Sequence, residues 1–513
     1  MACGHIERMR LDHDACYRAV CARDARFDGS FFTGVTTTGI YCRPICPAPI
    51  PKRTNVTFFP SAAAAQAAGF RPCLRCRPEI APELAAWRGT SNTVSRALAL
   101  MEKGALDGAP VAVLAERLGL GERQLRRLFQ RHLGASPLAV AQTRRLHLAK
   151  QLIHETHLSM TDVAHAAGFG SVRRFNETFR QMFQRAPASI RRVGALPPQS
   201  ASGDVVLLLA YRPPYDWPLI LAFLAKRAIP GIESVDDRRY ARAIEIDGAQ
   251  GIVGVEQAAG GALRAMIRFP RLSALPTIIA RLRRVFDLAA DPQAIAAHLC
   301  EDRTLAPLIA ARPGLRMPGA WDGFELAVRA VLGQQISIAA ARTLAGRLVT
   351  HFGTPLGVDR SGFEGLTHVF PQPAALAGVD LAALGLPKRR SAALSTLAGA
   401  VAADPLIFNP RGTLEEAILR LRGLPGIGEW TAQYIAMREL RESDAFPAAD
   451  LGLMRAMALL EGRQPSPKQL LARAELWRPW RAYAAQHLWA AEAAPTPNRH
   501  VRHSETELAA TVL

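Results

Sequence analysis

The sequence predicts a multidomain, mainly α-helical protein that contains two small α+β units. Its 513 residues exceed what one hydrophobic core usually organises, so three or four units are expected. Seven of the eight cysteines fall within the first 76 residues, which marks a small separate unit there. From about residue 90 onwards, apolar residues recur mostly at helical spacing between short loops rich in glycine and proline, with a strand-like region near 204–290.

The charge of the chain favours an anionic polymer as partner. The formal net charge is +19 and the isoelectric point is near 10.4. Ribosomal and membrane-surface proteins share this signature, so charge alone does not identify the partner. The first 200 residues hold 28 Lys and Arg against 14 Asp and Glu, whereas the rest holds 35 against 30. We therefore expect the N-terminal part to bind DNA more tightly than the remainder.

The N-terminus, MACGHIER, is polar and charged and lacks the apolar segment of a signal peptide. The longest apolar run, 205–210, is much shorter than the roughly 20 residues that a membrane-spanning helix needs. We therefore expect a cytoplasmic protein with no membrane partner. In that compartment, clustered cysteines favour metal binding or reactive thiols over disulfides.

Two close cysteine pairs, CRPIC at 42–46 and CLRC at 73–76, are separated by a linker long enough for a small fold. Four thiolates in two pairs fit the tetrahedral coordination of zinc. On spacing alone, a closed structural zinc site is the favoured interpretation. The predicted ligands are Cys42, Cys46, Cys73 and Cys76.

The residues around these pairs, FDGSFFTGVTTTGIYCRP at 27–44, NVTFF at 55–59 and GFRPC at 69–73, resemble the N-terminal domain of Ada, the bacterial adaptive-response methyltransferase. The resemblance implies one zinc ion on all four cysteines. It also makes Cys42 the nucleophile that accepts a methyl group from a methylphosphotriester in DNA. A zinc-bound thiol is held as the attacking thiolate. Methylation would remove one negative charge from the centre, so repair would raise the affinity for DNA phosphates.

Residues 111–131 and 160–180 each place apolar residues at helical spacing around a glycine-containing turn, which is typical of a helix-turn-helix. With the connecting helix 137–153 and the ending FQRAPASIRR at 183–192, they resemble the AraC-type DNA-binding domain. The recognition helices are expected to start near Glu122 and Ser171. Donors suited to base edges or phosphates are Arg123, Gln124, Arg127, Arg173, Arg174 and Asn176. A solvated arginine face is the alternative for any one of them.

A small α+β unit is expected next. Residues 205–209 read as a strand, 219–227 as a helix, and 263–269 as an alternating strand. The segments PPYDW at 213–217 and YARAI at 240–244 resemble the N-terminal subdomain of the AlkA-type 3-methyladenine DNA glycosylases. Its residues are interpreted as scaffold, with Tyr215 and Trp217 in the core.

The segment LPGIGEWTAQY at 424–434 combines two glycines around an apolar residue with the start of a helix. Such a hairpin lets bare backbone N–H groups approach a phosphate, which grips DNA independently of its sequence. Downstream, FPAAD at 446–450 places Asp450 just before the helical run 451–460. A carboxylate held there can face the nucleotide that the hairpin delivers. Gly426 and Gly428 are therefore predicted to contact DNA.

This segment resembles the helix-hairpin-helix-Gly/Pro-Asp DNA glycosylases, and among them the AlkA type. The resemblance makes Asp450 the residue that drives removal of a damaged base. Relatives that also cut the strand carry a lysine where this chain has Trp430, which implies a monofunctional glycosylase. The iron–sulfur cluster of some relatives needs four cysteines near the C-terminus, and none follows Cys300, so no cluster is expected.

The resemblance also implies an aromatic base pocket made by Trp430, Tyr434 and Trp489. Electron-rich rings attract a cationic alkylated base without precise hydrogen bonds, which would give a broad substrate range. In isolation, an aspartate before a helix is usually an N-cap, and aromatic residues at helical spacing are usually core. Their position after the hairpin favours the functional interpretation.

The segment GFELAVRAVLGQQISI at 323–338 matches the family's helix that leads to the side chain filling the gap left by a flipped nucleotide. An apolar wedge sits in AlkA where this chain has Gln335. Gln334 is the alternative contact, so both glutamines are candidate DNA-binding residues and the wedge is left open.

The prediction is a fusion of three known modules. Its expected parts are an Ada-type zinc domain (1–86), an AraC-type domain (90–194), a linker (195–203), an AlkA N-terminal-like subdomain (204–290), an all-α helix-hairpin-helix glycosylase domain (291–496) and a tail (497–513). The Pro-Cys-His-Arg motif of the Ada C-terminal methyltransferase is absent from the sequence, and the glycosylase takes its place.

The predicted function is repair of alkylated DNA by a monofunctional glycosylase joined to a methylation-responsive transcription regulator. The expected partners are alkylated and promoter duplex DNA, with RNA polymerase as a further candidate. The protein itself is expected to be a monomer associated with the nucleoid. Two alternatives stay open. One is a regulator with an inactive glycosylase-like clamp, and the other is an enzyme whose N-terminal modules serve only for targeting.

Overall fold

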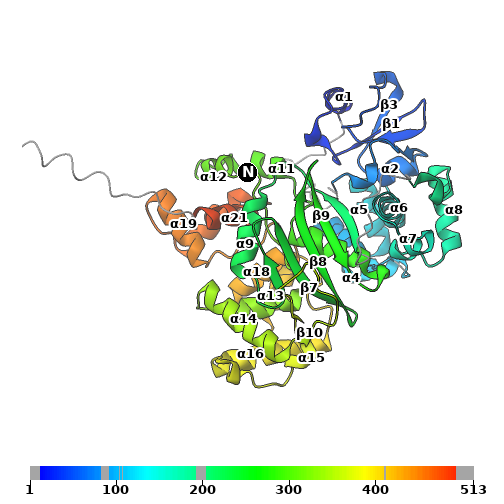
Figure 1. Cartoon of the computed structure of the whole chain (residues 1–513). Helices are drawn as coiled ribbons and strands as arrows, with labels where there is room; N and C mark the ends of the chain where they lie inside the picture. Colours follow the sequence, from blue (N-terminus) through cyan, green and yellow to red (C-terminus); the bar gives the residue numbers. More distant parts are fainter. Residues whose placement is uncertain are drawn as a thin grey trace, which may run out of the picture.

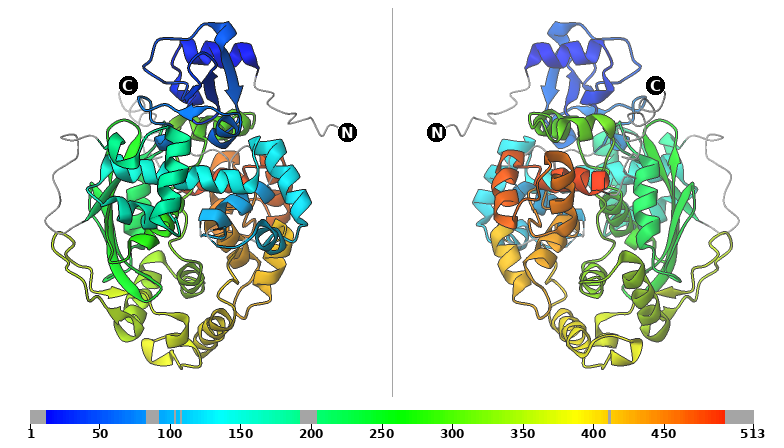
Figure 2. Two further views of the ribbon diagram at one scale, coloured as in Figure 1. Left: turned by 90° about the vertical axis from the view of Figure 1, so that its right-hand side faces the viewer. Right: turned by 90° about the vertical axis from the view of Figure 1, so that its left-hand side faces the viewer.

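The computed structural model describes residues 12–82, 92–102, 104–106, 108–191, 204–409 and 412–492. The predicted linker 195–203 and tail 497–513 lie outside the described residues. The cysteine-rich module forms one end of the molecule, and the helices between residues 338 and 403 form the opposite end (Figures 1 and 2). A five-stranded sheet lies between them (Figure 1).

The cysteine-rich module is a small α+β unit whose four-stranded sheet has the order β3-β1-β2-β4. β2 pairs with β1 in antiparallel register, Cys42 opposite Thr33, and with β4 in parallel register, Tyr41 opposite Pro72. The parallel pair therefore brings Cys73, which follows β4, beside Cys42. The elements are α1 (His13–Cys21), β1 (Phe32–Val35), β2 (Ile40–Cys42), β3 (Val56–Phe59), α2 (Ala62–Ala67) and β4 (Arg71–Pro72).

The next module is all-helical and holds both expected helix-turn-helix units. The first recognition helix starts at Glu122, and the second starts at Val172 with Ser171 as its N-cap, which agrees with the expected starts. Each packs its phenylalanines or leucines inward at intervals of four residues. The helices are α3 (Asn92–Glu102), α4 (Val111–Arg117), α5 (Glu122–Leu133), α6 (Pro137–Glu155), α7 (Met160–Ala166) and α8 (Val172–Phe183).

The third module is built on the antiparallel sheet β5-β9-β8-β7-β6. Residues of α9 (Trp217–Arg227) and α10 (Leu275–Val285) share a buried apolar cluster with this sheet, and Trp217 lies in it as expected. Phe363 and Leu366, from a later loop, pack on a second cluster with β7 and β8. The strands are β5 (Val205–Ala210), β6 (Glu233–Val235), β7 (Arg239–Ile246), β8 (Ala249–Ala258) and β9 (Ala262–Arg268).

The last module is a helical domain around one large apolar cluster. Its helices are α11 (Pro292–Leu299), α12 (Ala306–Ala311), α13 (Gly323–Leu332), α14 (Ile338–Phe352), α15 (Pro373–Leu376), α16 (Lys388–Ala403), α17 (Leu414–Arg422), α18 (Glu429–Arg438), α19 (Leu451–Glu461), α20 (Pro467–Ala474) and α21 (Arg481–Glu492). A two-residue strand pair, β10 (Thr354–Pro355) with β11 (His368–Val369), departs from the all-α expectation. Within the described ranges, no helix is long and apolar enough to cross a membrane.

Buried polar contacts join the modules. Lys150 of α6 pairs with Glu79 at 2.7 Å and donates to the carbonyl oxygen of Cys73 at 3.2 Å. Arg212, after β5, donates to the carbonyl oxygen of Asp28 and to the hydroxyl of Ser30. These contacts seat the cysteine-rich module on α6 and on the five-stranded sheet at the same time.

Candidate functional site: an aspartate in an aromatic cavity, a cysteine cluster and two recognition helices

Asp450 is fixed by three hydrogen bonds at the start of α19. As the N-cap of that helix, its Oδ1 accepts from the backbone nitrogen of Leu453 at 2.9 Å. The indole nitrogen of Trp489 donates to the same oxygen at 2.9 Å, and the indole nitrogen of Trp430 donates to Oδ2 at 2.7 Å. The expected N-cap and the expected aromatic neighbours are therefore both present. Helices α18, α19 and α21 together hold the carboxylate in one orientation.

A cavity of about 1270 Å³ opens beside this carboxylate. The three predicted aromatic residues line it together with Asp450, so the structure brings this part of the predicted site together. The rings of Trp430 and Tyr434 stack, with centroids 5.1 Å apart and planes 10° apart. The cavity is large enough for a nucleobase and its sugar.

The same cavity contains residues that the sequence did not single out. Phe223 and Arg227, four residues apart on α9, line it from the sheet module, which was interpreted only as scaffold. Arg438 of α18 also lines it and lies over the rings of Tyr434 and Trp489, at 4.9 Å and 5.6 Å from the ring centroids. A spacing of four on a helix predicts a shared face, but not which cavity that face meets.

The hairpin before α18 has the backbone geometry that its glycines require. Gly426 has a φ of +80°, and a Cβ there would approach the side chain of Ala393 to 2.7 Å. Gly428 is the N-cap of α18 without a side-chain cap, and a Cβ there would meet nothing within 4 Å. The first N–H groups of α18 are thus accessible for an anion such as phosphate.

The two candidate glutamines differ in environment. The side-chain nitrogen of Gln334 donates to the carbonyl oxygen of Gly426 at 2.8 Å and lies 3.3 Å from the hydroxyl of Thr431. Gln334 therefore ties the α13–α14 turn to the hairpin. Gln335 is exposed at the same turn and has a φ of +60°, an uncommon conformation for a residue with a side chain. Arg390 secures this turn by donating to the backbone oxygen of Gln334 at 2.6 Å.

The sulfur atoms of Cys42, Cys46, Cys73 and Cys76 all lie within 4.8 Å of one another. Hydrogen bonds with the thiol groups of Cys46, and then of Cys73 and Cys76, raise the pKa of Cys42. A negative charge on its sulfur would be crowded by the three other sulfur atoms. Four thiolates need a cation in this space, and the donor set and spacing fit tetrahedral zinc. Backbone N–H groups of Arg43 and Arg75 donate to sulfur atoms of the cluster at 3.4 Å.

The predicted recognition residues lie on α5 and α8. Asn176 is half-buried, and five others are exposed: Arg123, Gln124, Arg127, Arg173 and Arg174. Arg173 pairs with Glu177 on its own helix at 2.9 Å. These exposed donors are available to base edges or to phosphates.

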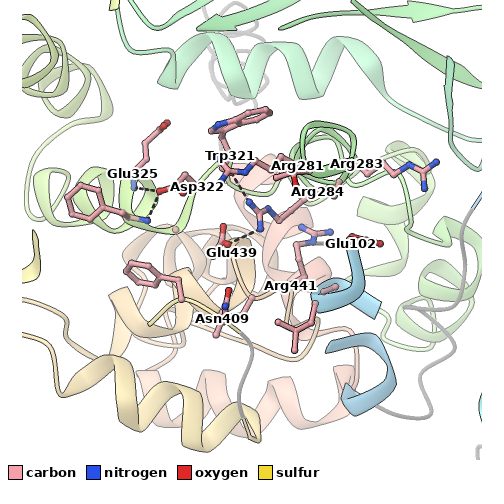
Figure 3. Close-up of a pocket in the computed structure, with 18 of the residues that line it drawn as sticks. Glu102, Arg281, Arg283, Arg284, Trp321, Asp322, Glu325, Asn409, Glu439 and Arg441 are labelled. Atoms are coloured by element: carbon pink, nitrogen blue, oxygen red, sulfur yellow. Dashed lines mark hydrogen bonds and ion pairs between the residues drawn. The ribbon is translucent and has the colours of Figure 1, made fainter. Parts of the chain in front are cut away.

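A second cavity, of about 960 Å³, lies between α3 and the third and last modules, which are the five-stranded sheet module and the last helical module. Figure 3 shows arginines and glutamates side by side on part of its wall, with Arg284 paired to Glu439 at 2.8 Å. Both cavities share four lining residues: Arg242, Trp321, Asp322 and Glu325. Nearby, Arg96 of α3 pairs with Glu442 at 2.6 Å. The charged groups named here bind one another, which is typical of an interface between modules.

Four family models match successive parts of the chain. They are the metal binding domain of Ada at residues 15–79, a helix-turn-helix domain at 114–193, the AlkA N-terminal domain at 206–322 and the HhH-GPD superfamily base excision DNA repair protein at 328–482. Together with the site geometry, these matches define the class: a base-excision DNA repair protein fused to a zinc-binding, DNA-binding regulator.

Similar proteins indicate which kind of repair protein this chain is. The chain is 43% identical over 484 residues to the probable bifunctional transcriptional activator/DNA repair enzyme AlkA of Mycobacterium tuberculosis, which covers 94% of this chain and 97% of the relative. It is 37% identical to DNA-3-methyladenine glycosylase 2 of Escherichia coli, over 55% of this chain and 96% of that protein. It is 35% identical to the bifunctional transcriptional activator/DNA repair enzyme Ada of Escherichia coli, over 30% and 43% respectively.

The chain therefore belongs to the family of bifunctional transcriptional activator/DNA repair enzymes of the AlkA type. The resemblance to Ada, to a helix-turn-helix domain and to AlkA is confirmed, and so is the multidomain fold class. The roles assigned to single residues and the predicted module boundaries stay predictions.

Proposed function

We propose that this protein is a monofunctional DNA glycosylase that removes alkylated purines such as 3-methyladenine from duplex DNA. One observation supports this most. Asp450 is held by two indole N–H groups inside a cavity that accommodates a nucleobase, beside a hairpin with accessible backbone N–H groups. The family membership agrees with this activity.

In the proposed reaction, the damaged nucleotide leaves the base stack and enters the cavity, because a stacked base cannot be attacked. Alkylation at a ring nitrogen makes the base cationic, so it leaves as a neutral molecule. The C1′–N bond breaks and positive charge develops on the sugar. Asp450 stabilises that charge and orients the water whose oxygen bonds to C1′, and the proton that this water loses passes by way of the carboxylate to solvent. Trp430 supports no lyase step, because its indole nitrogen is not a nucleophilic amine.

The test is release of methylated bases from alkylated duplex DNA by the full chain and by Asp450→Asn. Asparagine still caps a helix, so this variant removes the charge and leaves α19 capped. We expect release to fall by about 100-fold or more. The matched control is Asp380→Asn, since Asp380 is an exposed carboxylate that accepts from Ala382 and Ser391 in the same module. Equal release by Asp450→Asn and the wild type would refute the catalytic role and favour a regulator with an inactive clamp.

We further propose that Cys42 accepts a methyl group from a methylphosphotriester. Its sulfur attacks the methyl carbon, an S–C bond forms, the C–O bond breaks, and the electron pair leaves on the phosphate oxygen as a phosphodiester anion. One zinc ion, held by Cys42, Cys46, Cys73 and Cys76, would keep the attacking sulfur deprotonated. Methylation removes one negative charge near DNA, which would strengthen promoter binding by α5 and α8.

Mass spectrometry after incubation with methylphosphotriester DNA tests this transfer. One methyl group is expected on Cys42 and none on Cys21, an exposed cysteine outside the cluster. Metal analysis should give one zinc per chain and no iron. Footprinting at an alkylation-response promoter should strengthen after transfer, and an unchanged footprint would refute the switch. We propose a monomer that acts at the nucleoid in the cytoplasm and recruits RNA polymerase.

A further inference from the structure

A chain of hydrogen bonds leads from the cysteine cluster into the part of the chain that starts at residue 204, which we call the repair half. Arg43 directly follows Cys42 in the sequence and is buried. Its backbone nitrogen donates to the sulfur of Cys76 at 3.4 Å, and its guanidinium donates to the carbonyl oxygen of Cys76 at 3.2 Å. Arg43 therefore fixes the orientation of its chain neighbour Cys42 relative to Cys76.

Asp28 holds Arg43 in this position. The Nε atom of Arg43 donates to Oδ1 of Asp28 at 2.8 Å, and its Nη2 atom donates to Oδ2. The two side chains are only 10% and 7% exposed, so water competes little for this pair. Asp28 begins a tight turn, because the next residue, Gly29, has a φ of +73° and a Cβ there would collide with the carbonyl oxygen of Pro82. The position of Asp28 therefore depends on what supports this turn.

Arg212 supports the turn from the repair half. Its Nη2 atom donates to the carbonyl oxygen of Asp28 at 2.6 Å and to the hydroxyl of Ser30 at 2.7 Å. Its Nη1 atom pairs with Asp291, the N-cap of α11, and its backbone oxygen accepts a hydrogen bond from Arg316. The repair half thus holds Arg212 at both ends. Because Arg212 is buried, its loss would remove a donor that water does not readily replace.

Methyl transfer depends on the direction in which the accepting sulfur points. The S–C bond forms on the side of the methyl carbon opposite the C–O bond that breaks, and the phosphodiester keeps the electron pair. Sulfur, carbon and leaving oxygen must therefore lie in one line. A displacement of about 1 Å can slow such a reaction by about 100-fold. Bound DNA fixes the methyl group, so the protein has to fix the sulfur.

We propose that Arg212 is a positioning residue for methyl transfer to Cys42. Arg212 supports the turn at Asp28, and this turn holds Arg43. Arg43 in turn fixes the Cys42 sulfur, which accepts the methyl group of a methylphosphotriester in DNA. The role rests on the proposed methyl-acceptor function. It makes the repair half a working part of the methyl acceptor, although all four cysteines belong to the N-terminal module.

Single-turnover methyl transfer to the zinc-loaded full chain, measured at Cys42 by mass spectrometry, tests this role. The probes are a duplex with one methylphosphotriester and methyl iodide, a small donor whose direction of approach is not fixed by DNA. Arg212→Met should lower the rate at saturating duplex by about tenfold or more. The half-saturating duplex concentration and the rate with methyl iodide should stay within about threefold of the wild type. Arg212→Lys, which keeps a charged donor, should regain part of the rate.

A second variant, Ser30→Ala, weakens the same contact from the N-terminal module and leaves Arg212 in place. It should slow transfer from the duplex by about three- to tenfold, as expected for loss of one hydrogen bond. Its release of 7-methylguanine should equal that of the wild type, which shows that the repair half stays folded. A further measurement does not depend on activity: hydrogen exchange of the peptide that contains Arg43 should accelerate by at least about tenfold in Arg212→Met.

The matched control is Arg264→Met, since Arg264 lies on the same five-stranded sheet and pairs with Glu256 at an exposed position. It should match the wild type with both methyl donors. Equal losses with the duplex and with methyl iodide in Arg212→Met would show a general loss of structure and overturn the proposal. An unchanged rate at saturating duplex would overturn it as well, while the methyl-acceptor function would stand. No transfer from the duplex to the wild type would overturn that function and this role with it.

Discussion

Trp430 donates its indole hydrogen to Asp450 over 2.7 Å, across twenty residues of sequence. The same ring stacks on Tyr434, so a single side chain joins the carboxylate to the aromatic wall of the cavity. Helix α18 carries both aromatic residues and begins at the hairpin glycine. The hairpin and the orientation of the carboxylate are therefore linked through one helix.

Trp430→Phe separates these two roles, because phenylalanine keeps an aromatic ring and removes the donor. Loss of a hydrogen bond to a charged group should slow release of 7-methylguanine by about 10- to 100-fold. Single-turnover kinetics measure this effect. In the Asp450→Asn background the same substitution should cost much less, since the charged acceptor is gone. Fully additive losses would mean that the indole acts independently of Asp450.

Lys150→Met should destabilise the contact between the cysteine-rich module and α6. Neither Lys150 nor Glu79 has a solvent-exposed side chain, and the substitution leaves the Glu79 carboxylate buried without its lysine. The expected loss is about 1–3 kcal/mol of unfolding free energy, because Arg77 remains paired with Glu79 at 3.0 Å. Urea denaturation with a zinc-release dye measures it. The double variant Lys150→Met/Glu79→Gln should regain part of the loss, and an equal loss in both would contradict the pairing.

His487 predicts a fall in stability at mildly acidic pH. Burial, and secondarily the charge of Arg312, lower the pKa of His487 from 6.5 to about 4. Between these two pH values, His487 is therefore protonated in the unfolded chain and neutral in the folded chain. The contribution of neutral His487 is complete above pH 6.5 and is lost as the pH falls towards 4, by about 3 kcal/mol in total.

Urea denaturation at pH 7.5 and pH 5, followed by tryptophan fluorescence, tests this dependence. His487→Gln should be less sensitive to the pH change than the wild type, because glutamine does not titrate. The matched control is His351→Gln, since His351 is exposed on α14 of the same module. If His487→Gln loses as much stability as the wild type between the two pH values, other groups cause the dependence.

Arg96→Met should loosen α3 from the glycosylase-like modules. Arg96 pairs with Glu442 at 2.6 Å and also donates to the carbonyl oxygen of Gly412, which precedes α17. Burial raises the pKa of Glu442 although Arg96 opposes this, so loss of the arginine should favour its protonation further. Hydrogen exchange of α3 should accelerate by at least about tenfold, as expected for loss of more than 1.4 kcal/mol.

The control for this experiment is Arg126→Met. Arg126 pairs with Glu122 on the exposed face of α5, where such pairs contribute little. Exchange of α3 should be unchanged in this variant. Unchanged exchange in Arg96→Met as well would show that the buried pair does not hold α3.

Local motifs carried most of the sequence-based prediction. The cysteine pairs, both recognition helices and the segment that ends at Asp450 are each short, and their spacing reflects geometry that neighbouring residues create. The close approach of the four cysteines follows from the parallel pairing of β2 with β4, which agrees with the zinc prediction.

The remaining features depend on contacts between distant segments. Arg227 reaches the cavity because α9 of the sheet module packs beside α14 and lines the same cavity as α18, both of the last helical module. The sequence around Arg227 predicts only a helix. Arg96 and Glu442 are 346 residues apart. The hydrogen bond from Gln334 to Gly426 likewise requires both turns to be in place. No periodicity in the sequence contains such information, because it arises only when the modules dock.

The buried guanidinium of Arg212 makes the two halves of the chain depend on each other for their hydrogen bonds. Arg212 belongs to the repair half, yet it donates hydrogen bonds to Asp28 and Ser30 of the N-terminal module. In the opposite direction, Arg96 of the N-terminal half donates to Glu442 and Gly412 of the repair half. Cutting the chain in two would leave buried ionic and polar groups unsatisfied on both products. A substitution at either of these contacts is therefore expected to lower the stability of both halves of the chain.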